Sequence, residues 1–387
     1  MSNMSEKLPG VGALIASLLL PATASAYDLS DVFGGKVKFS IGGYAKLSAM
    51  WTDTDSGSLA GGASGTGRTF YLPSSIPTGG SDGDAVFDMT ARESRIHFKA
   101  NTLAGDHALG MVLEMDFLTT GFGNEVVSNS NSPRLRHYFL TYDNWLFGQT
   151  WSTFMDTAAL PDALDFLGAP EGTVFIRQPM IRYSWNGFQI ALENPETFTD
   201  TGVNDDNSVP DIAANYKLSR DWGHLRLNGL FRELKYDDGT NEDSTTGWGV
   251  GISGKVKVMD RDDFRFALNY GDGMGRYTSL GVARDAVVDP ANGDLESVES
   301  VAGFAAYRHQ WNSKWRSNLI YSFVEVDNPS AAPGSLNESA SSVQVNLMYN
   351  PTKPITLGLM YLKGELEKES GDDGELDRIQ FAAKYSF

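Results

Sequence analysis

The sequence predicts an all-β protein, a 16-stranded antiparallel transmembrane β-barrel with one loop folded inward as a constriction. Three observations support this fold class. Apolar and polar side chains alternate along many segments, short and long turns follow one another, and an aromatic residue, Phe387, ends the chain. Strands of about 9–11 residues can cross a bilayer at a tilt. Outer-membrane barrels join such strands by short periplasmic turns and long external loops.

Residues 1–26 have the features of a secretory signal peptide. Lys7 supplies a positive charge, an apolar run follows it, and Ala24-Ser25-Ala26 matches a small-residue cleavage site. The apolar run is shorter than the roughly 20 residues that a membrane-spanning helix needs. We therefore expect the mature chain, residues 27–387, to form one barrel domain. The alternative is that the apolar run is a buried helix of a soluble domain.

The composition argues against several classes of function. The chain has 49 acidic and 31 basic residues and a net charge of −18, which argues against nucleic acid as a partner because phosphate binding needs a basic face. A mean hydropathy of −0.26 is too polar for a helical membrane protein. None of the five histidines forms a His-Glu-x-x-His motif, and there is no cysteine. We therefore expect no metal site and no cofactor.

The last strand shows the alternation most clearly, because side chains of a strand point to opposite faces in turn. The apolar and aromatic face consists of Ile379, Phe381, Ala383, Tyr385 and Phe387. The opposite face consists of Arg378, Gln380, Ala382, Lys384 and Ser386. This pattern fits a wall strand with one face in lipid and the other in water. The aromatic end is the expected signal for outer-membrane assembly in bacteria.

The same alternation recurs along the chain and predicts an even number of strands, as single-chain bacterial barrels require. In chain order the predicted strands cover residues 37–51, 86–101, 106–118, 133–143, 144–151, 175–185, 187–193, 211–219, 223–236, 246–259, 264–270, 298–310, 314–326, 340–349, 355–365 and 376–387. The sheet is expected to close on itself, because an open edge in lipid would leave backbone groups unpaired at several kcal/mol each.

The predicted turns alternate in length, and acidic residues are concentrated in the long ones. Short turns cover residues 219–222, 260–263, 310–313 and 350–354. Long loops cover residues 52–83, 194–210, 271–296 and 327–339. Acidic stretches at residues 200–206, 237–243 and 367–377 are predicted to be external. The negative net charge therefore does not by itself set the charge of the pore.

Several motifs resemble the DcaP-like porin family and, more distantly, the general bacterial porins. They are Ala91-Arg92-Glu93-Ser94-Arg95, Pro133-Arg134-Leu135-Arg136-His137, Trp145-Leu146-Phe147-Gly148-Gln149-Thr150-Trp151-Ser152-Thr153-Phe154, Pro170-Glu171-Gly172-Thr173 and Ile176-Arg177-Gln178. The run from Gly148 to Ser152 is the most specific. The resemblance covers much of the mature chain and implies a homotrimer of barrels that takes up small anions such as dicarboxylic acids. No heptad pattern precedes the barrel, so a trimer would rest on the barrel walls.

The loop of residues 152–174 is the predicted constriction. The resemblance implies that this loop folds into the lumen and narrows it. Its composition fits a packed plug, because apolar side chains are interspersed with acids such as Asp156 and Asp165. The alternative is an external loop that rests on the barrel rim.

The wall opposite this loop is predicted to carry the cations that select the solute. Lumen-facing candidates by alternation are Arg95, Lys99, Arg134, Arg136, Arg182, Arg226, Arg265 and Arg378. Arg95, Arg134 and Arg136 rank first because their motifs match the family. A guanidinium can form two parallel bonds to a carboxylate, and a ring of arginines in a narrow pore favours anions.

Two alternatives concern the roles of these cations. Each arginine could serve no filter and simply pair with a nearby acid, the candidates being Glu93, Glu114 and Asp116. Arg177 and Arg182 also lie on opposite parities of one strand. One of them is therefore predicted to face outward unless Pro179 marks a bulge.

These features together predict an outer-membrane porin for passive uptake of small anionic solutes. Its expected partners are those solutes, outer-membrane lipid and lipopolysaccharide, and further copies of the chain in a homotrimer. The alternatives are a non-selective diffusion porin, a structural barrel with a blocked lumen and, from another class, an outer-membrane barrel hydrolase. A hydrolase needs a nucleophile with a base in reach. The pairs to consider are Ser132 with His137 and Ser94 with His97, and no catalytic residue is assigned.

Overall fold

The computed structural model describes residues 27–28, 36–61, 66–119, 128–204 and 207–387. The expected signal peptide, residues 1–26, lies outside the described residues. Among the residues that the structure describes, no helix is long and apolar enough to cross a membrane.

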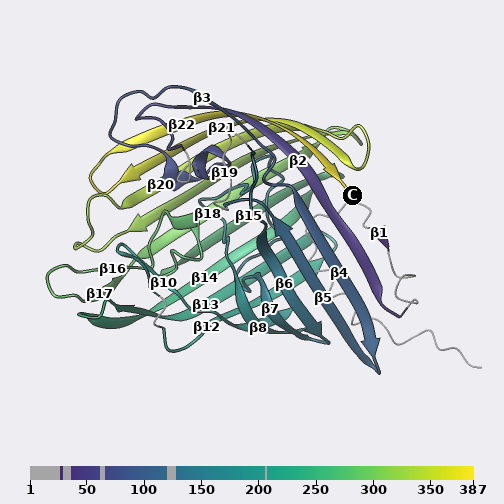
Figure 1. Cartoon of the computed structure of the whole chain (residues 1–387), viewed down its shortest axis with the longest axis horizontal. Helices are drawn as coiled ribbons and strands as arrows, with labels where there is room; N and C mark the ends of the chain where they lie inside the picture. The colour runs from purple at the N-terminus through teal and green to yellow at the C-terminus, as the bar shows by residue number, and fades with distance from the viewer. Residues whose placement is uncertain (1–26, 29–35, 62–65, 120–127, 205–206) are drawn as a thin grey trace, which may run out of the picture.

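The wall is a closed barrel of 16 antiparallel strands (Figure 1). Its segments are β2 (Lys38–Thr54), β3 (Val86–Thr90), β4 (Arg95–Ala104), β5 (His107–Asp116), β6 (Arg134–Tyr142), β7 (Trp145–Trp151), β8 (Arg177–Trp185), β9 (Phe188–Glu193), β12 (Asp211–Arg220), β13 (Gly223–Asp237), β14 (Glu242–Val258), β15 (Asp262–Asp272), β18 (Glu299–Gln310), β19 (Trp315–Asp327), β20 (Asn337–Tyr349), β21 (Ile355–Lys368) and β22 (Asp373–Ser386). β3 and β4 together form one wall strand, since both pair with β2. The barrel closes where β2 pairs with β22, and the short β1 (Tyr27–Asp28) adds to β2.

The predicted strands and closure are confirmed, with one interruption that the alternation did not reveal. The predicted strand at residues 86–101 is divided, because residues 91–94 leave the ladder between β3 and β4. Ser94 Oγ accepts a hydrogen bond from the Lys46 backbone N–H at 3.0 Å and contacts the Lys46 carbonyl oxygen at 3.3 Å. The side chain thus replaces the missing strand partner of Lys46, as buried backbone groups require.

The strict alternation of short and long turns is wrong at two external connections. Residues 238–241 and 369–372 form tight links, because β13, β14, β21 and β22 continue past their predicted ends. Cross-strand pairing therefore runs through much of the acidic sequence that was expected to be loop. The acids remain at the external end, on strands that project beyond the apolar band.

The two faces of the wall follow the predicted alternation. On β22, Ile379, Phe381 and Tyr385 are exposed on the outside, whereas Arg378 and Gln380 are buried on the inside. Outward apolar side chains match a lipid environment and inward polar ones match a lumen. The fold of the protein therefore places it in the outer membrane.

Loops fill much of the external half of the lumen. Residues 55–61, 66–85, 152–176 and 273–298 contribute to buried apolar clusters on the inner wall, with Tyr71, Leu164 and Val282 in the largest cluster. A small sheet of β10 (Thr197–Thr199), β11 (Gly202–Asn204), β16 (Ala286–Val288) and β17 (Leu295–Ser297) lies among the external loops. In Figure 1 this sheet is at the left end, opposite the end where the chain terminates. The lumen is consequently narrow where the loops meet.

Candidate functional site

The loop of residues 152–176 crosses the lumen and binds to the far wall. Gly172 N–H donates to Ser322 Oγ at 2.9 Å, and Asn346 Nδ2 donates to the Asp162 carbonyl oxygen at 3.0 Å. Lys46 Nζ donates to the Leu164 carbonyl oxygen at 2.6 Å. The loop therefore touches β19, β20 and β2 from within, which agrees with the predicted inward constriction and not with a loop resting on the rim.

Several of the predicted lumen arginines hold this loop. Arg182 Nε donates to Thr153 Oγ1 at 2.7 Å and its Nη2 donates to the Trp151 carbonyl oxygen. Arg226 Nη2 donates to the Thr153 carbonyl oxygen, and Arg265 Nη1 donates to the Leu160 carbonyl oxygen at 2.5 Å. A guanidinium suits this task because its donors are fixed in one plane. These three arginines fix the path of the loop through the pore.

Asp156 is a fixed part of the loop anchor. Its Oδ2 lies 2.8 Å from His224 Nε2 and accepts a hydrogen bond from Ser253 Oγ at 2.9 Å. Burial alone would raise the pKa of the Asp156 carboxyl, but the His224 hydrogen bond and the Arg226 charge outweigh burial and lower the pKa. Asp156 is therefore an anion held against β13 and β14, on the side of the loop that faces this wall.

Asp165 and Glu171 tie the same loop to Tyr71 of the first external loop. The Tyr71 N–H donates to Asp165 Oδ2 at 2.9 Å, and the Tyr71 hydroxyl donates to Glu171 Oε1 at 2.7 Å. Ser342 Oγ also donates to Glu171 Oε2 at 2.9 Å. Burial raises the pKa of both carboxyls, and that of Glu171 to about 7. Glu171 is thus a buried acid that links two loops and β20.

A cluster of four arginines occupies the opposite wall, on β4, β6 and β8. We call Arg95, Arg134, Arg136 and Arg177, with the acids Glu114 and Asp116 of β5, the eyelet cluster. Arg134 binds Asp116 through Nε and Nη2, each at 2.8 Å. Arg136 binds Glu114 at 2.8 Å and Asp116 at 2.9 Å, and Arg95 lies 3.4 Å from Glu114. Three of the four guanidinium groups therefore share two carboxylates, and Arg177 adds a fourth positive charge beside them.

A bulge in β6 explains how neighbouring residues reach the lumen. His137 pairs with Glu114 and Leu135 pairs with Met115, so Arg136 is the extra residue between them. A bulge of this kind changes the facing of side chains along the strand. Arg136 and His137 are consequently both buried, although they are adjacent in sequence. The alternation placed Arg134 and Arg136 inside but did not reveal the bulge.

Aromatic rings separate the guanidinium groups of the eyelet cluster. The Arg136 Cζ atom lies 5.4 Å from the ring centre of Phe166 and 5.7 Å from that of Trp151. Arg134 lies 5.9 Å from the Phe166 ring, and Arg177 lies 4.4 Å from the Trp151 ring. Cations are attracted to the faces of such rings. Because Phe166 belongs to the constriction loop, the cluster and the loop meet across the passage.

The sequence predicts that one of Arg177 and Arg182 faces outward unless Pro179 marks a bulge. This prediction is wrong, because there is no bulge and neither side chain faces outward. Pro179 pairs with Gln149 in a regular register, and Arg182 is buried inside. Arg177 has the outward parity, but it is the first residue of β8, and its side chain packs on buried Trp151. Strand ends at the rim bend toward the loops, so parity does not decide the direction there. Arg177 is therefore a member of the site that alternation missed.

The predicted cations thus separate into groups and do not form one ring. Arg95, Arg134 and Arg136 meet at the eyelet cluster, whereas Arg182, Arg226 and Arg265 hold the loop. Arg378 donates to Thr52 Oγ1 at 2.8 Å and to the Gly67 carbonyl oxygen at 2.6 Å, which ties down the first loop. Lys99 lies on the inner parity of β4, nearer the turn to β5. Of the aromatic members of the site, Trp151 lies in a motif that stands out in the sequence, whereas no signal in the sequence identifies Phe166.

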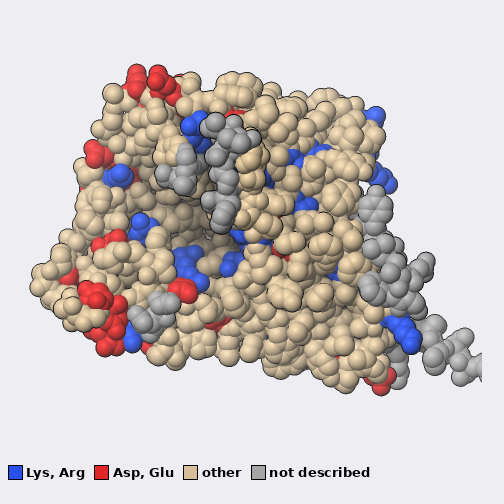
Figure 2. Space-filling view, viewed as in Figure 1, with Lys and Arg blue, Asp and Glu red and all other residues tan. Residues whose placement is uncertain are grey.

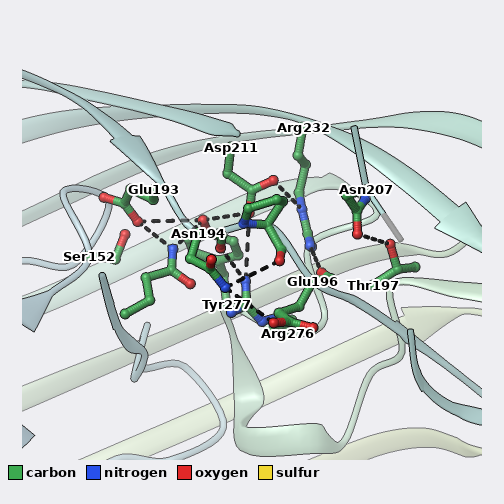
Figure 3. Close-up of polar contacts among 12 residues, drawn as sticks. Ser152, Glu193, Asn194, Glu196, Thr197, Asn207, Asp211, Arg232, Arg276 and Tyr277 are labelled. Carbon is green, nitrogen blue, oxygen red and sulfur yellow. Dashed lines mark hydrogen bonds and ion pairs between the residues drawn. The ribbon is translucent and has the colours of Figure 1, made fainter. Parts of the chain in front are cut away.

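A buried polar network joins the root of the constriction loop to the third long loop (Figure 3). Thr153 N–H donates to Glu193 Oε1 at 2.6 Å. The Tyr277 hydroxyl lies 3.4 Å from Glu193 Oε2 and donates to Asp211 Oδ2 at 2.8 Å. Arg232 lies 3.4 Å from Asp211 on the other side. The network holds residues 152–176 and 273–298 in one fixed arrangement.

The space-filling view agrees with this division of charge. Figure 2 shows a hollow whose depth is lined by lysine and arginine atoms, while acidic atoms gather around its rim and on the external end at the left. The hollow seen in this view is therefore lined by cations and the external end is acidic, in a chain with a net charge of −18.

Comparisons with known proteins agree with this architecture. The chain is similar to the outer membrane channel DcaP of Acinetobacter baumannii, with a TM-score of 0.76, 25% identity and coverage of 91% of this chain and 98% of that chain. The fold also resembles a loop-deletion mutant of OmpT, an outer membrane protein of Vibrio cholerae, with a TM-score of 0.57, 12% identity and coverage of 91% and 100%. An anion-selective porin from Comamonas acidovorans gives a TM-score of 0.57, 10% identity and coverage of 91% and 100%. A search of curated proteins finds no match.

A family model matches most of the chain. The model described as DcaP outer membrane protein covers residues 62–387. This range contains the eyelet cluster, the constriction loop and all wall strands after β2. The barrel, the inward loop and this match together show a channel of the bacterial outer membrane, and the chain belongs to the DcaP outer membrane protein family.

Proposed function

We propose that this channel passes small anionic solutes, with the eyelet cluster as its selective element. The observation that carries the proposal is the charge balance of that cluster, which holds four arginines and only two acids, Glu114 and Asp116, and in which three of the arginines pair with those acids. Glu93, the next acid along the wall, is taken by Lys46 at 2.5 Å. The local charge is therefore positive, and a positive constriction lowers the barrier for anions.

Dicarboxylic acids are the solute class that this arrangement fits best. Arg134 is bound to Asp116 and yet keeps 22% of its side chain exposed. Arg177 forms no ion pair within the described part of the chain, and its Nη1 is buried without a hydrogen-bond acceptor. Two guanidinium groups held apart by Phe166, Arg136 and Trp151 could each accept one carboxylate of a solute. A monocarboxylate would use one of them.

The acidic exterior is compatible with this proposal. The acids of residues 237–243 and 367–377 lie at the external ends of β13, β14, β21 and β22. Exposed charges separated by more than about 8 Å are largely screened at physiological ionic strength. The rim acids therefore change the local ion concentration at the mouth, while the sign of the selectivity is set at the constriction.

The assembly and the surroundings of the barrel complete the proposal. We take residues 1–26 as the export signal and the barrel as a homotrimer, in contact with outer-membrane lipid and lipopolysaccharide. The fold of OmpT from Vibrio cholerae, which has a structure described as a trimer form, is similar at 13% identity. Outward aromatic residues such as Trp185, Trp311 and Trp315 suit the membrane interfaces of each barrel.

Reversal potentials in planar bilayers test the sign of the selectivity. Under a KCl gradient, the wild-type channel should prefer chloride, and Arg134→Gln with Arg177→Gln should lower that preference about fivefold, equivalent to about 1 kcal/mol. The matched control removes two exposed turn cations by Arg220→Gln with Lys353→Gln and should leave the preference unchanged. A wild-type channel that prefers potassium would refute the proposal, and one without preference would favour the non-selective porin.

The hydrolase alternative has no supporting observation. Ser94 Oγ is engaged by the Lys46 backbone, and His137 Nδ1 lies 2.9 Å from Thr150 Oγ1. The family and the similar structures are channels. Turnover of lipid or peptide by the purified protein would be the result that favours a hydrolase.

A further inference from the structure

A second group of cations lies on the inner wall away from the eyelet cluster. We call Lys217 of β12, Lys255 and Lys257 of β14, and Arg308 of β18 the vestibule strip. By the alternation of their strands, all four point to the inside, near the short turns that follow or precede them. Short turns mark the periplasmic end of such a barrel. The strip therefore lines the periplasmic vestibule.

The register places like charges directly opposite two of the four strip cations, and Asp263 opposite the other two, Lys257 and Arg308. Lys217 is the Cα partner of Arg226, and Lys255 is the Cα partner of Arg265. Directly opposed like charges destabilise a sheet. This arrangement therefore has a cost in stability that a wall with alternating charges would avoid, and the cost is explained if the cations serve an anion.

The acids on this wall do not neutralise the strip. Asp263 contacts Arg308 at 2.6 Å, Arg265 at 2.6 Å and Lys255 at 3.6 Å. Asp156 is the other acid that faces these strands, and it binds His224, Ser253 and Arg226. Asp262 has the opposite parity and binds Tyr307 and His309, and Asp162 of the loop binds Arg316. Within the described residues, neither the Lys217 nor the Lys257 side chain forms an ion pair.

The strip is separate from the eyelet cluster and is open to water. The constriction loop lies between them, because Phe166 packs on Arg134 and Arg136 while Leu160 receives the Arg265 hydrogen bond. The side chains of Lys255 and Arg308 are 35% and 26% exposed. Charges that remain this exposed can exchange their hydration for a solute ion.

We propose that the vestibule strip is a second anion-binding site, specific for small soluble anions that carry two or more negative charges. Lysine ammonium groups act as point charges and bind phosphate-like groups without a fixed orientation. β12, β14 and β18 are each separated by one intervening strand, so strip cations on successive members stand about 9.6 Å apart in the pairing direction. The long side chains of two such cations can converge on one compact polyanion placed between them. The strip would take up such anions on the periplasmic side, whichever solute the eyelet cluster selects.

Inorganic diphosphate added to one side of a planar bilayer is the probe. Because the chain has no cysteine, a single Ser370→Cys in the external turn lets a bulky thiol reagent identify the external side. Diphosphate should reduce the chloride current at lower concentration from the short-turn side than from the external side. In Lys217→Gln, Lys255→Gln, Lys257→Gln, the half-blocking concentration on the short-turn side should rise roughly tenfold.

A matched variant separates a site from general mouth charge. Arg220→Gln, Lys314→Gln, Lys353→Gln removes the same number of cations from exposed periplasmic turns and should leave the sided block as it is in the wild type. An equal rise in both triple variants, or no rise in the strip variant, would overturn the proposal. If the triple strip variant inserts poorly into bilayers, Lys217→Gln alone should still raise the half-blocking concentration of diphosphate, by less than the triple variant. Calorimetric titration of the detergent-solubilised triple variant with diphosphate should then show one binding event fewer than the wild type.

The outcome is independent of the eyelet proposal. Arg134→Gln with Arg177→Gln should change the reversal potential and keep the sided diphosphate block. Loss of the sided block in that variant would show that diphosphate acts at the eyelet cluster, which would also overturn the second site. A sided block that survives in a channel without anion preference would support the strip and refute the function proposed for the eyelet.

Discussion

The arginines of the eyelet cluster meet carboxylates and aromatic rings, whereas the loop-anchoring arginines, Arg182 of β8, Arg226 of β13 and Arg265 of β15, donate to backbone oxygens of the constriction loop and its root. Arg136 is 1% exposed and contacts Glu114, Asp116, Trp151 and Phe166. Arg226 donates to a backbone oxygen of the loop, and the side chain of Lys217 opposite it forms no ion pair with a described residue. The same residue type thus serves as a rigid part of the passage in one group and as an anchor of the loop in the other.

The difference shows that the position of an arginine on a lumen face does not reveal its role. An arginine that spends its donors on fixed carbonyl oxygens shapes the pore, because it decides where the loop lies. Where arginines outnumber the acids beside them, a positive potential remains, and this potential attracts an anionic solute. The arginines that hold the loop should therefore control pore size, and the eyelet cluster should control selectivity.

The largest effect is expected at the arginines that hold the constriction loop. Arg182→Leu removes the hydrogen bonds to Thr153 and Trp151 and should weaken the loop contact by about 2–3 kcal/mol, the range for hydrogen bonds from a charged group. Single-channel conductance should rise and its fluctuations should increase, with a lower temperature of thermal unfolding. Arg220→Gln in an exposed turn is the control and should change neither. A conductance equal to that of the wild type would show that Arg182 does not anchor the loop.

An increase in chloride preference is expected when an acid of the eyelet cluster is neutralised. Asp116→Asn keeps the shape of the side chain but removes one of the two acids of the eyelet cluster, so chloride preference should increase in a KCl gradient. The loss of the charge-assisted bonds from Arg134 and Arg136 should also cost about 1.5–3 kcal/mol in stability. Asp53→Asn, at an exposed outward position of β2, provides the comparison. A decrease in chloride preference would contradict the assignment of the eyelet cluster.

A moderate and pH-dependent effect is expected at Glu171, which links the constriction loop to Tyr71 of the first loop and to Ser342 of β20. Burial raises the pKa of this carboxyl from 4.5 to about 7. Its contribution to stability is therefore complete below about pH 4.5 and is lost as the pH rises through about 7. Current fluctuations should be smaller at pH 5 than at pH 8.

The variant Glu171→Gln mimics the protonated form and should remove this dependence. Glu367→Gln, an exposed acid at the external end of β21, should respond to pH as the wild type does. If Glu171→Gln retained the full difference between pH 5 and pH 8, another group would be responsible.

The smallest effect is expected from Lys99, which belongs to neither group. Lys99→Gln should lower the chloride preference by less than about twofold, because this residue lies beyond the eyelet cluster toward the turn after β4 and its charge is screened by water in the vestibule. The same reversal-potential measurement checks this. An effect as large as that of Arg134→Gln with Arg177→Gln would move the selective element toward the periplasmic end.

Much of the barrel could be predicted from local sequence because strand alternation is a local property. Ile379, Phe381 and Tyr385 face outward as their spacing requires, and Arg378 and Gln380 face inward. The prediction failed where a few residues break the repeat. The bulge at Arg136 and the gap between β3 and β4 arise from contacts with Glu114 and Lys46, which no window of the sequence contains.

The sequence predicts which cations face the lumen, but it does not predict which of them lie together in the structure. Arg95, Arg134 and Arg136 were named from motifs and do lie together, whereas Arg182, Arg226 and Arg265 were named by the same alternation and bind the loop. Alternation reports which face a side chain occupies, and it carries no information on what lies across the lumen. Arg177 and Phe166 were missed as members of the site for that reason.

The sequence by itself determined the class of the protein: exposed and buried faces, the number of wall strands and an aromatic C-terminal strand. Each of these follows from a period of two residues and from the need to pair every backbone group in lipid. Only the tertiary structure decided the path of the constriction loop and the division of cations between anchor, eyelet cluster and vestibule strip. Those depend on contacts between residues far apart in the chain, such as Lys46 with Leu164 and Ser342 with Glu171, and such contacts form only when the barrel closes.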